Sequence, residues 1–106
     1  MAQEHNDNVE RILTLIKQVP PGCVATYGQI AKLAGIPRNS RQVGSVLKKL
    51  PAGSGVPWYR IVNSKGEISD RENESSQNIQ RMALEEEGIS FDDNDRIRLK
   101  EFQWSP

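Results

Sequence analysis

The side chains that most often act as nucleophiles or metal ligands are scarce in this chain, which has one cysteine, Cys23, and one histidine, His5. A thiol reacts as its thiolate and is usually activated by a neighbouring base or cation. A structural zinc site needs four ligands, mostly Cys and His. His5 lies in a polar N-terminal segment and is not placed to activate Cys23. We therefore expect no metal, no cofactor and no disulfide within the chain, and the single cysteine favours a reducing, cytoplasmic setting.

The most informative segment is residues 56–62, which read Val-Pro-Trp-Tyr-Arg-Ile-Val. It resembles the active-site strand of the DNA alkylguanine alkyltransferases, in which a cysteine stands between a proline and a histidine, followed by arginine and two β-branched residues. Here Trp58 stands at the cysteine position and Tyr59 at the histidine position. An indole has no thiolate and cannot take an alkyl group by displacement. The chain therefore resembles the alkyltransferase-like proteins, which bind alkylated guanine without repairing it, and the resemblance extends from about Val9 to Gly88.

Two short helices joined by a tight turn are expected to lie just before this segment. Thr26, followed by Gln29 three residues later, forms a capping-box pattern at the start of the first helix, and Gly35 suits its C-terminal end. Ser40 is expected to cap the second helix. Together they form a helix-turn-helix pattern. An amphipathic helix precedes the pair, with apolar residues at i, i+3, i+4 and i+7: Val9, Ile12, Leu13 and Ile16.

A hairpin and a fourth helix are expected to follow. Residues 60–62 and 67–69 flank a four-residue turn and should pair as the wing of a winged helix. The pattern after the polar loop predicts a helix over 77–87. Its inward-facing residues are expected to be Ile79, Met82 and Ala83.

The C-terminal part is expected to form a second hairpin, from residues 89–91 and 97–99, with Phe102 and Trp104 fastening the tail to the core. A chain of 106 residues suffices for one domain with a modest core. We therefore predict a single, mainly α domain with small β-hairpins, a winged helix-turn-helix like the C-terminal domain of the alkyltransferases. It spans 1–106, with the polar segment 1–7 and the tail 100–106 at its margins.

Charge is strongly segregated along the chain, although 14 basic and 14 acidic residues balance. Residues 1–10 carry three acids and no base, and residues 67–106 carry eleven acids and five bases, a net −6. A purely basic block lies between them and indicates one face built for a polyanion, flanked by acidic regions. The alternative is an uneven but solvated surface. The nine basic residues of this block are Arg11, Lys17, Lys32, Arg38, Arg41, Lys48, Lys49, Arg60 and Lys65.

The resemblance implies that the second helix of the pair enters the minor groove of DNA. Arg41 matches the family arginine that replaces the flipped nucleotide in the base stack, the alternative being an ordinary phosphate contact. Tyr27 matches the family tyrosine that promotes nucleotide rotation, the alternative being a half-buried core residue. Gly44 and Ser45 are small enough for close approach to DNA, although Gly44 could instead serve helix packing. The residues expected to contact DNA are Tyr27, Arg41, Thr26, Ser40, Gln42, Gly44, Ser45, Lys48 and Arg60.

Trp58 is expected to line a pocket for the flipped base, because an indole offers a flat apolar face to a purine or an alkyl group. The alternative is that Trp58 fills the space and leaves no pocket. Arg71 lies where the family has its lesion-binding loop, or is simply solvated. Glu87 matches a glutamate of the family's catalytic relay, which has no nucleophile here; we expect it to bond Arg60 or Tyr59, or to be a solvated helix end. The expected pocket residues are Trp58, Pro57, Tyr59, Arg71 and Ser69.

The resemblance implies a non-enzymatic DNA damage sensor. It would bind double-stranded DNA through the minor groove, flip an O6-alkylguanine and flag it for nucleotide excision repair proteins. We expect a monomer without membrane association, located with the nucleoid in a bacterium or in the nucleus of a eukaryote. Two alternatives remain: a winged-helix transcription regulator, which leaves Trp58 and Arg41 unexplained, and an alkyltransferase acting through Cys23.

Overall fold

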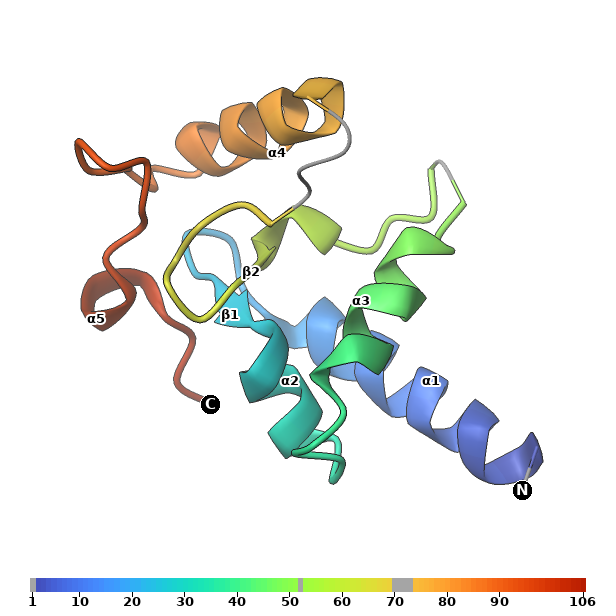
Figure 1. The fold of residues 1–106 in the computed structure, drawn as a ribbon. Helices are drawn as coiled ribbons and strands as arrows, with labels where there is room; N and C mark the ends of the chain where they lie inside the picture. Colours follow the sequence, from blue (N-terminus) through green and yellow to red (C-terminus); the bar gives the residue numbers. More distant parts are fainter. Residues whose placement is uncertain (1, 52, 70–73) are drawn as a thin grey trace.

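The fold is mainly helical, with one very small sheet at its centre (Figure 1). The structure, a computed structural model, describes residues 2–51, 53–69 and 74–106. In chain order the elements are α1 (Ala2–Gln18), β1 (Ala25–Thr26), α2 (Tyr27–Leu33), α3 (Ser40–Lys48), the 3-10 turn η1 (Trp58–Arg60), β2 (Ile61–Val62), α4 (Glu74–Glu86) and α5 (Leu99–Phe102).

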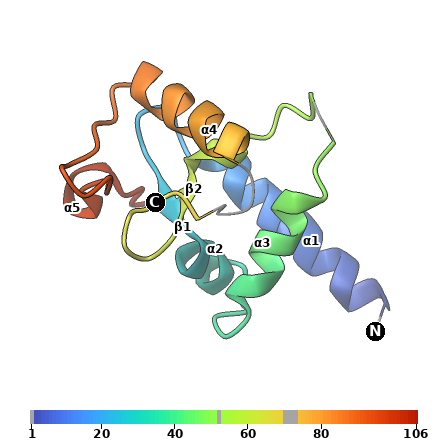
Figure 2. The same cartoon turned by 45° about the horizontal axis from the view of Figure 1, so that its top comes forward.

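Helices α2 and α3 form the expected helix-turn-helix and pack on each other and on α1 (Figures 1 and 2). The predicted capping box is confirmed, since Thr26 Oγ1 accepts from the Gln29 amide at 3.0 Å and the Gln29 side chain accepts from the Thr26 amide at 3.4 Å. Gly35 follows α2 with φ +83°, as its predicted place requires. Ser40 is not the cap of α3: Asn39 takes that position with a non-helical φ of −126°, and Ser40 is the first helical residue.

The two-stranded sheet lies between two hydrophobic cores. Strands β1 and β2 are parallel, with Ala25 opposite Ile61 and Thr26 opposite Val62. Because successive strand residues face opposite sides, Ile61 packs into a core with α1, α2 and α3, whereas Val62 packs into a second core with α4 and the C-terminal segment. The second core consists of Val24, Val62, Leu84, Ile89 and Ile97.

The predicted wing hairpin of 60–62 with 67–69 was wrong. Residues 61–62 pair with β1 instead, and 67–69 form no strand. The chain reverses through a tight turn in which Asn63 Oδ1 accepts from the backbone amides of Lys65 and Glu67, both at 2.9 Å. The local turn chemistry was therefore recognised, but the sheet partner came from a distant part of the chain.

This turn is fixed by contact with the C-terminal segment. Gly66 has φ +78°, and a Cβ there would collide with the carbonyl group of Ile97. The Ile97 amide donates to the Gly66 carbonyl at 2.8 Å. The predicted terminal hairpin is reduced to one antiparallel bridge between Phe91 and Ile97, because Leu99 already begins α5.

Helix α4 is rotated relative to the prediction. Ile79 and Met82 are 58% and 62% exposed, whereas Gln80 and Leu84 face inward, with Ala83 half-buried. The polar groups of η1 and β2 explain this rotation, because the Gln80 amide donates to two backbone carbonyls there. The hydrogen bonds from Gln80 to these buried carbonyls therefore contribute more to the orientation of α4 than burial of Ile79 and Met82 would.

The C-terminal tail is fastened to both cores, as predicted. Trp104 packs against the first core and Phe102 against the second. The Val24 amide donates to the Phe102 carbonyl at 2.9 Å, and the Trp104 amide donates to the Val24 carbonyl at 2.7 Å. The Gln29 side chain also donates to the Trp104 carbonyl at 2.7 Å. The tail therefore adds a third backbone segment beside β1.

Candidate nucleic-acid interface and base pocket

Residues 58–60 of the expected active-site strand form the 3-10 turn η1, and residues 61–62 are strand β2. A 3-10 helix has about three residues per turn, so three consecutive side chains leave it in three directions. Trp58 lines a pocket, whereas Tyr59 and Arg60 bond to Glu87 outside the lining of that pocket. The two aromatic rings meet edge to face, with centroids 5.9 Å apart. One turn thus separates a pocket from a polar network.

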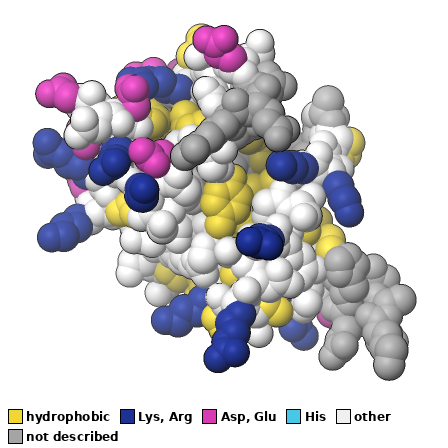
Figure 3. All heavy atoms as spheres, in the orientation of Figure 1, with side chains coloured by type: hydrophobic (Ala, Val, Ile, Leu, Met, Phe, Trp, Pro, Cys, Tyr) yellow, Lys and Arg dark blue, Asp and Glu magenta, His cyan; other side chains and the backbone are white. Residues whose placement is uncertain are grey.

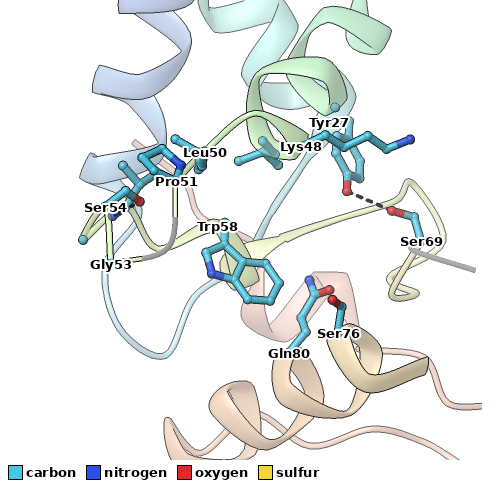
Figure 4. A pocket seen from close by; sticks show the side chains of 14 residues that line it. Tyr27, Lys48, Leu50, Pro51, Gly53, Ser54, Trp58, Ser69, Ser76 and Gln80 are labelled. Carbon is cyan, nitrogen blue, oxygen red and sulfur yellow. Dashed lines mark hydrogen bonds between the residues drawn. The ribbon is translucent and has the colours of Figure 1, made fainter. Parts of the chain in front are cut away.

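The pocket has a volume of about 740 Å³ and lies between α3 and α4 (Figure 4). In Figure 4 the ring of Trp58 stands between the loop that follows α3 and the side chains of Gln80 and Ser76 on α4. Pro57 is buried and does not line it. The lining consists of Tyr27, Gly44, Leu47, Lys48, Leu50, Pro51, Gly53, Ser54, Gly55, Val56, Trp58, Ser69, Ser76 and Gln80.

Tyr27 and Ser69 form one edge of the pocket. Their hydroxyl groups are 2.8 Å apart and hydrogen-bonded (Figure 4). The Tyr27 ring also packs against the first core, so the half-buried role and the pocket role coexist. A Cβ on Gly44 would lie 3.9 Å from this ring, an ordinary contact distance. Helix packing alone therefore does not require glycine at that position.

Glu87 is the centre of the polar network on the other side of η1. Its carboxylate accepts from Arg60 Nη2 at 2.6 Å, the Tyr59 hydroxyl at 3.2 Å and the Gly22 amide at 3.1 Å. Arg60 Nη1 donates to the Val19 carbonyl at 2.9 Å. The expectation that Glu87 bonds Arg60 or Tyr59 is confirmed for both. The network links the end of α4 to the segment that follows α1.

Burial and charge shift the ionisation of these groups. Burial of Glu87 opposes its charge, but hydrogen bonds from Arg60 and the Gly22 amide outweigh that effect, so the pKa of Glu87 lies below its ordinary value. The hydrogen bond to Glu87 raises the pKa of Arg60. Burial raises the pKa of the Tyr59 hydroxyl, against the Arg60 charge and with the help of Glu87. The carboxylate and guanidinium are therefore both charged at neutral pH.

Burial and contacts within the fold change the interpretation of three residues predicted to contact DNA. The side chain of Arg60 is 11% exposed and engaged with Glu87, so it belongs to the fold. Thr26 is 8% exposed and caps α2. Gln42 is 9% exposed and accepts a hydrogen bond from the Asn39 side chain at 3.2 Å. Thr26 and Gln42 were predicted from their place in the helix-turn-helix and Arg60 from its place in the basic block, and neither reveals which way a side chain turns.

The remaining basic residues of the central block form a cationic face. Within the described part of the chain, ion pairs are made by Arg60, Arg81 and Arg96. Figure 3 shows Lys and Arg side chains across this view, mixed with Asp and Glu side chains toward the top and upper left and with few acidic side chains over the lower half. The cationic face consists of the eight exposed basic residues of the block: Arg11, Lys17, Lys32, Arg38, Arg41, Lys48, Lys49 and Lys65.

Helix α3 presents part of this face beside the pocket. Arg41 and Ser45 are exposed, Ser40 is half-buried, and the exposed Lys48 also lines the pocket. Exposed cationic side chains next to a pocket of base size suit a nucleic acid with one nucleotide turned out. Arg71 lies outside the described residues.

Several pocket residues were missed by the reasoning from sequence. The missed residues carry no motif of their own: Leu47, Leu50, Pro51, Gly53, Ser54, Gly55, Val56, Ser76 and Gln80. Gln80 alone left a signal, because Gln80, Leu84 and Glu87 recur at i, i+4 and i+7 and so share one helix face. Polar residues at two of these three positions disguised the buried face of α4.

The single cysteine lies away from the pocket lining. Cys23 is partly buried against the first core. Among the described residues, no group of three or more Cys, His, Asp and Glu side chains is arranged to hold a metal ion. Over the same residues, no helix has both the length and the apolar character needed to cross a membrane.

The chain matches known proteins over most of its length. Residues 7–89 match the family described as the DNA-binding domain of 6-O-methylguanine DNA methyltransferase. The DNA base-flipping protein of Vibrio parahaemolyticus is 43% identical over 96 residues, which cover 91% of this chain and 94% of that protein. Alkyltransferase-like protein 1 of Schizosaccharomyces pombe is 36% identical over 100 residues, covering 91% of this chain and 93% of that protein.

Solved structures agree with these matches. The S. pombe Atl1 structure in complex with damaged DNA containing O6-carboxymethylguanine superposes with a TM-score of 0.86 at 34% identity, over 95% of this chain and 97% of that one. The Mycobacterium tuberculosis OGT structure in complex with DNA gives a TM-score of 0.60 at 28% identity, over 79% of this chain and 48% of that one. The chain therefore belongs to the 6-O-methylguanine DNA methyltransferase DNA-binding family, as one of its alkyltransferase-like proteins.

Proposed function

We propose that this protein is a DNA damage sensor that rotates an O6-alkylated guanine out of duplex DNA and holds it in the Trp58 pocket without accepting the alkyl group. The observation that carries the proposal is an indole lining a pocket of about 740 Å³ at the position where the family resemblance puts a cysteine. This volume lies within the range of small-molecule sites. An indole provides stacking surface but no nucleophile.

The cationic face supports a binding mode for the duplex. Phosphates would lie along the exposed Lys and Arg side chains, with α3 against the groove. Arg41 extends from α3 and would enter the space left by the rotated nucleotide, where a guanidinium can stack on bases and donate hydrogen bonds. Tyr27 and Ser69, bonded at the pocket edge, would border the path of the sugar and its phosphate. These contacts would offset the few kcal/mol that unstacking a base costs.

The absence of alkyl transfer rests on the position of the only thiol. Cys23 packs against the first core and is not among the residues that line the pocket. A base held beside Trp58 would therefore not meet a thiolate. Intact-mass measurement after incubation with DNA containing O6-methylguanine should return the unmodified protein mass. A stable mass increase mapped to Cys23 would establish an alkyltransferase instead.

A sensor without chemistry must pass its lesion to other proteins. We propose that the protein acts as a monomer and is located where the cell's DNA is. Its complex with the lesion would flag the site for nucleotide excision repair. The names of the relatives support the first part of this role, since one is called a DNA base-flipping protein and another was solved on damaged DNA.

The competing proposal is a transcription regulator that reads undamaged DNA. It is weakened by the missing second strand of the wing among the described residues, and it gives Trp58 no task. Equilibrium binding to two otherwise identical duplexes, one with O6-methylguanine and one with guanine, at one stated salt concentration, separates the two. We expect a preference of about tenfold or more for the lesion, roughly 1.4 kcal/mol. Equal affinities would favour the regulator.

A further inference from the structure

Gln80 is a buried amide that faces the pocket. It lies on α4, is 5% exposed and lines the pocket opposite Trp58 (Figure 4). Its Nε2 donates to the Tyr59 carbonyl at 3.1 Å and to the Ile61 carbonyl at 3.0 Å. An amide nitrogen has two protons, so both of its donors are in use. The side chain is therefore held in one orientation by the backbone of η1 and β2.

These bonds also decide where the acceptor of Gln80 lies. Carbonyl oxygens only accept, so the atom facing them must be the nitrogen and the other must be Oε1. Among the described residues, no hydrogen bond to Oε1 is formed, and no fully buried side-chain oxygen lacks a partner. Oε1 therefore keeps access to the pocket. The pocket contains a hydrogen-bond acceptor whose direction is fixed before any ligand arrives.

The chemistry of the base indicates what this acceptor can bind. A nucleotide that rotates out of DNA bound at α3 leaves its sugar at the rim of the pocket. The edge of the base remote from the sugar therefore enters the pocket first. In guanine that edge carries O6, N1 and the 2-amino group. Alkylation at O6 leaves N1 without its proton, so the 2-amino group is the remaining donor on this edge. An unpaired buried amide oxygen would favour a base with that donor.

We infer that Gln80 Oε1 accepts a hydrogen bond from the 2-amino group of the flipped O6-alkylguanine and so restricts the pocket to 2-aminopurines. This inference rests on the proposed function and adds a specificity-determining residue to it. Trp58 supplies a stacking face for any purine, whereas Gln80 distinguishes among purines. O6-methylhypoxanthine, which has neither a 2-amino group nor any other donor on this edge, leaves Oε1 without a partner.

The test compares a duplex containing O6-methylguanine with one containing O6-methylhypoxanthine, which differs by the 2-amino group alone. We expect the wild-type protein to bind the first about two- to tenfold more tightly, the effect of one neutral hydrogen bond. Gln80→Lys keeps donors for the two carbonyls but has no acceptor, and Gln80→Met is a neutral variant of similar length with neither. Both should reduce this affinity ratio about two- to tenfold relative to the wild type. Using the same duplexes throughout cancels differences in their own stability.

Gln77→Met is the matched control, one turn earlier on α4 and outside the pocket lining. It should keep the wild-type ratio. Thermal unfolding identifies which Gln80 variant is folded, and either one suffices. A wild-type ratio of one, or a Gln80 variant that keeps the full ratio, would overturn the inference while leaving lesion binding intact. Loss of any preference for O6-methylguanine over guanine would instead contradict the proposed function.

Discussion

The two sides of η1 differ in how their polar groups are satisfied. On one side Glu87 accepts hydrogen bonds from Arg60, Tyr59 and the Gly22 amide, and the carboxylate is 15% exposed. On the other side Trp58 presents an apolar ring to an open pocket, beside an amide oxygen that keeps solvent access. The first side is complete without a ligand, and the second is not. Within one turn, Trp58 is therefore available to a ligand while Tyr59 and Arg60 hold the fold.

The largest effect on stability should come from disrupting the hydrogen-bond network around Glu87. Glu87→Ala leaves the Arg60 guanidinium and the Gly22 amide without their acceptor in a partly buried site. We expect the free energy of unfolding to fall by about 3 kcal/mol, the lower end of what breaking a buried ion pair costs. Chemical denaturation measures it. Because Glu87 does not line the pocket, the preference of the folded variant for O6-methylguanine over guanine should remain.

Glu86→Ala provides the matched control for this variant. Glu86 precedes Glu87 in the chain and is exposed. Its removal should change the free energy of unfolding by less than about 0.5 kcal/mol. Equal effects at both positions would mean that the network contributes little to the fold.

Acid should also weaken the network around Glu87, with a smaller loss of stability than Glu87→Ala causes. The pKa of Glu87 in the folded protein lies below its ordinary value of 4.5, so the folded state favours the carboxylate. The stability it contributes is present above pH 4.5 and is lost as pH falls through the folded pKa. We expect the stability difference between wild type and Glu87→Gln to be constant near neutral pH and to shrink below pH 4.5. A difference that grows on acidification would contradict this sign.

On the pocket side, Arg41→Ala should weaken binding to the lesion duplex by about tenfold, or roughly 1.4 kcal/mol. The loss should be greater for O6-methylguanine than for guanine, because Arg41 is proposed to fill the vacated base position. Arg38→Ala removes another exposed arginine just before α3. It should weaken both duplexes alike. If the two variants behaved identically, Arg41 would be a phosphate contact.

The smallest effect should come from a single charge on the cationic face. Lys49→Ala should lower affinity for damaged and undamaged duplexes by the same factor. If Lys49 contacts a phosphate, the slope of log K against log salt should become less steep by about 0.9. A salt titration of both duplexes measures it. A change in lesion preference would show that Lys49 acts at the pocket.

Local chemistry made much of the fold predictable. The capping box of Thr26 and Gln29, the glycine after α2 and the fastening of the tail by Trp104 all follow from short-range patterns or strong apolar residues. The prediction of the wing was wrong because β2 pairs with β1, which lies far away in the sequence. The pairing of two-residue strands leaves no pattern in sequence that a turn motif could reveal.

The sequence predicted which residue types the site contains, but it did not predict which way their side chains point. Trp58 and Ser69 line the pocket as expected, and Glu87 meets Tyr59 and Arg60. Tyr59 points to the network because consecutive residues of η1 diverge. A strand would also have placed Tyr59 opposite Trp58, but it would have returned Arg60 to the side of Trp58. Gln80 was hidden because a buried glutamine resembles a surface residue until its backbone partners are known.

The most direct test of a pocket that reads a lesion without chemistry is the affinity ratio for O6-methylguanine over guanine, measured for the wild type and for Trp58→Ala. Stacking a base on an aromatic side chain is worth about 1–3 kcal/mol. We predict a wild-type ratio of about ten or more and a ratio near one for Trp58→Ala, with both proteins folded by thermal unfolding. A wild-type ratio near one, or an unchanged ratio in the variant, would contradict the account.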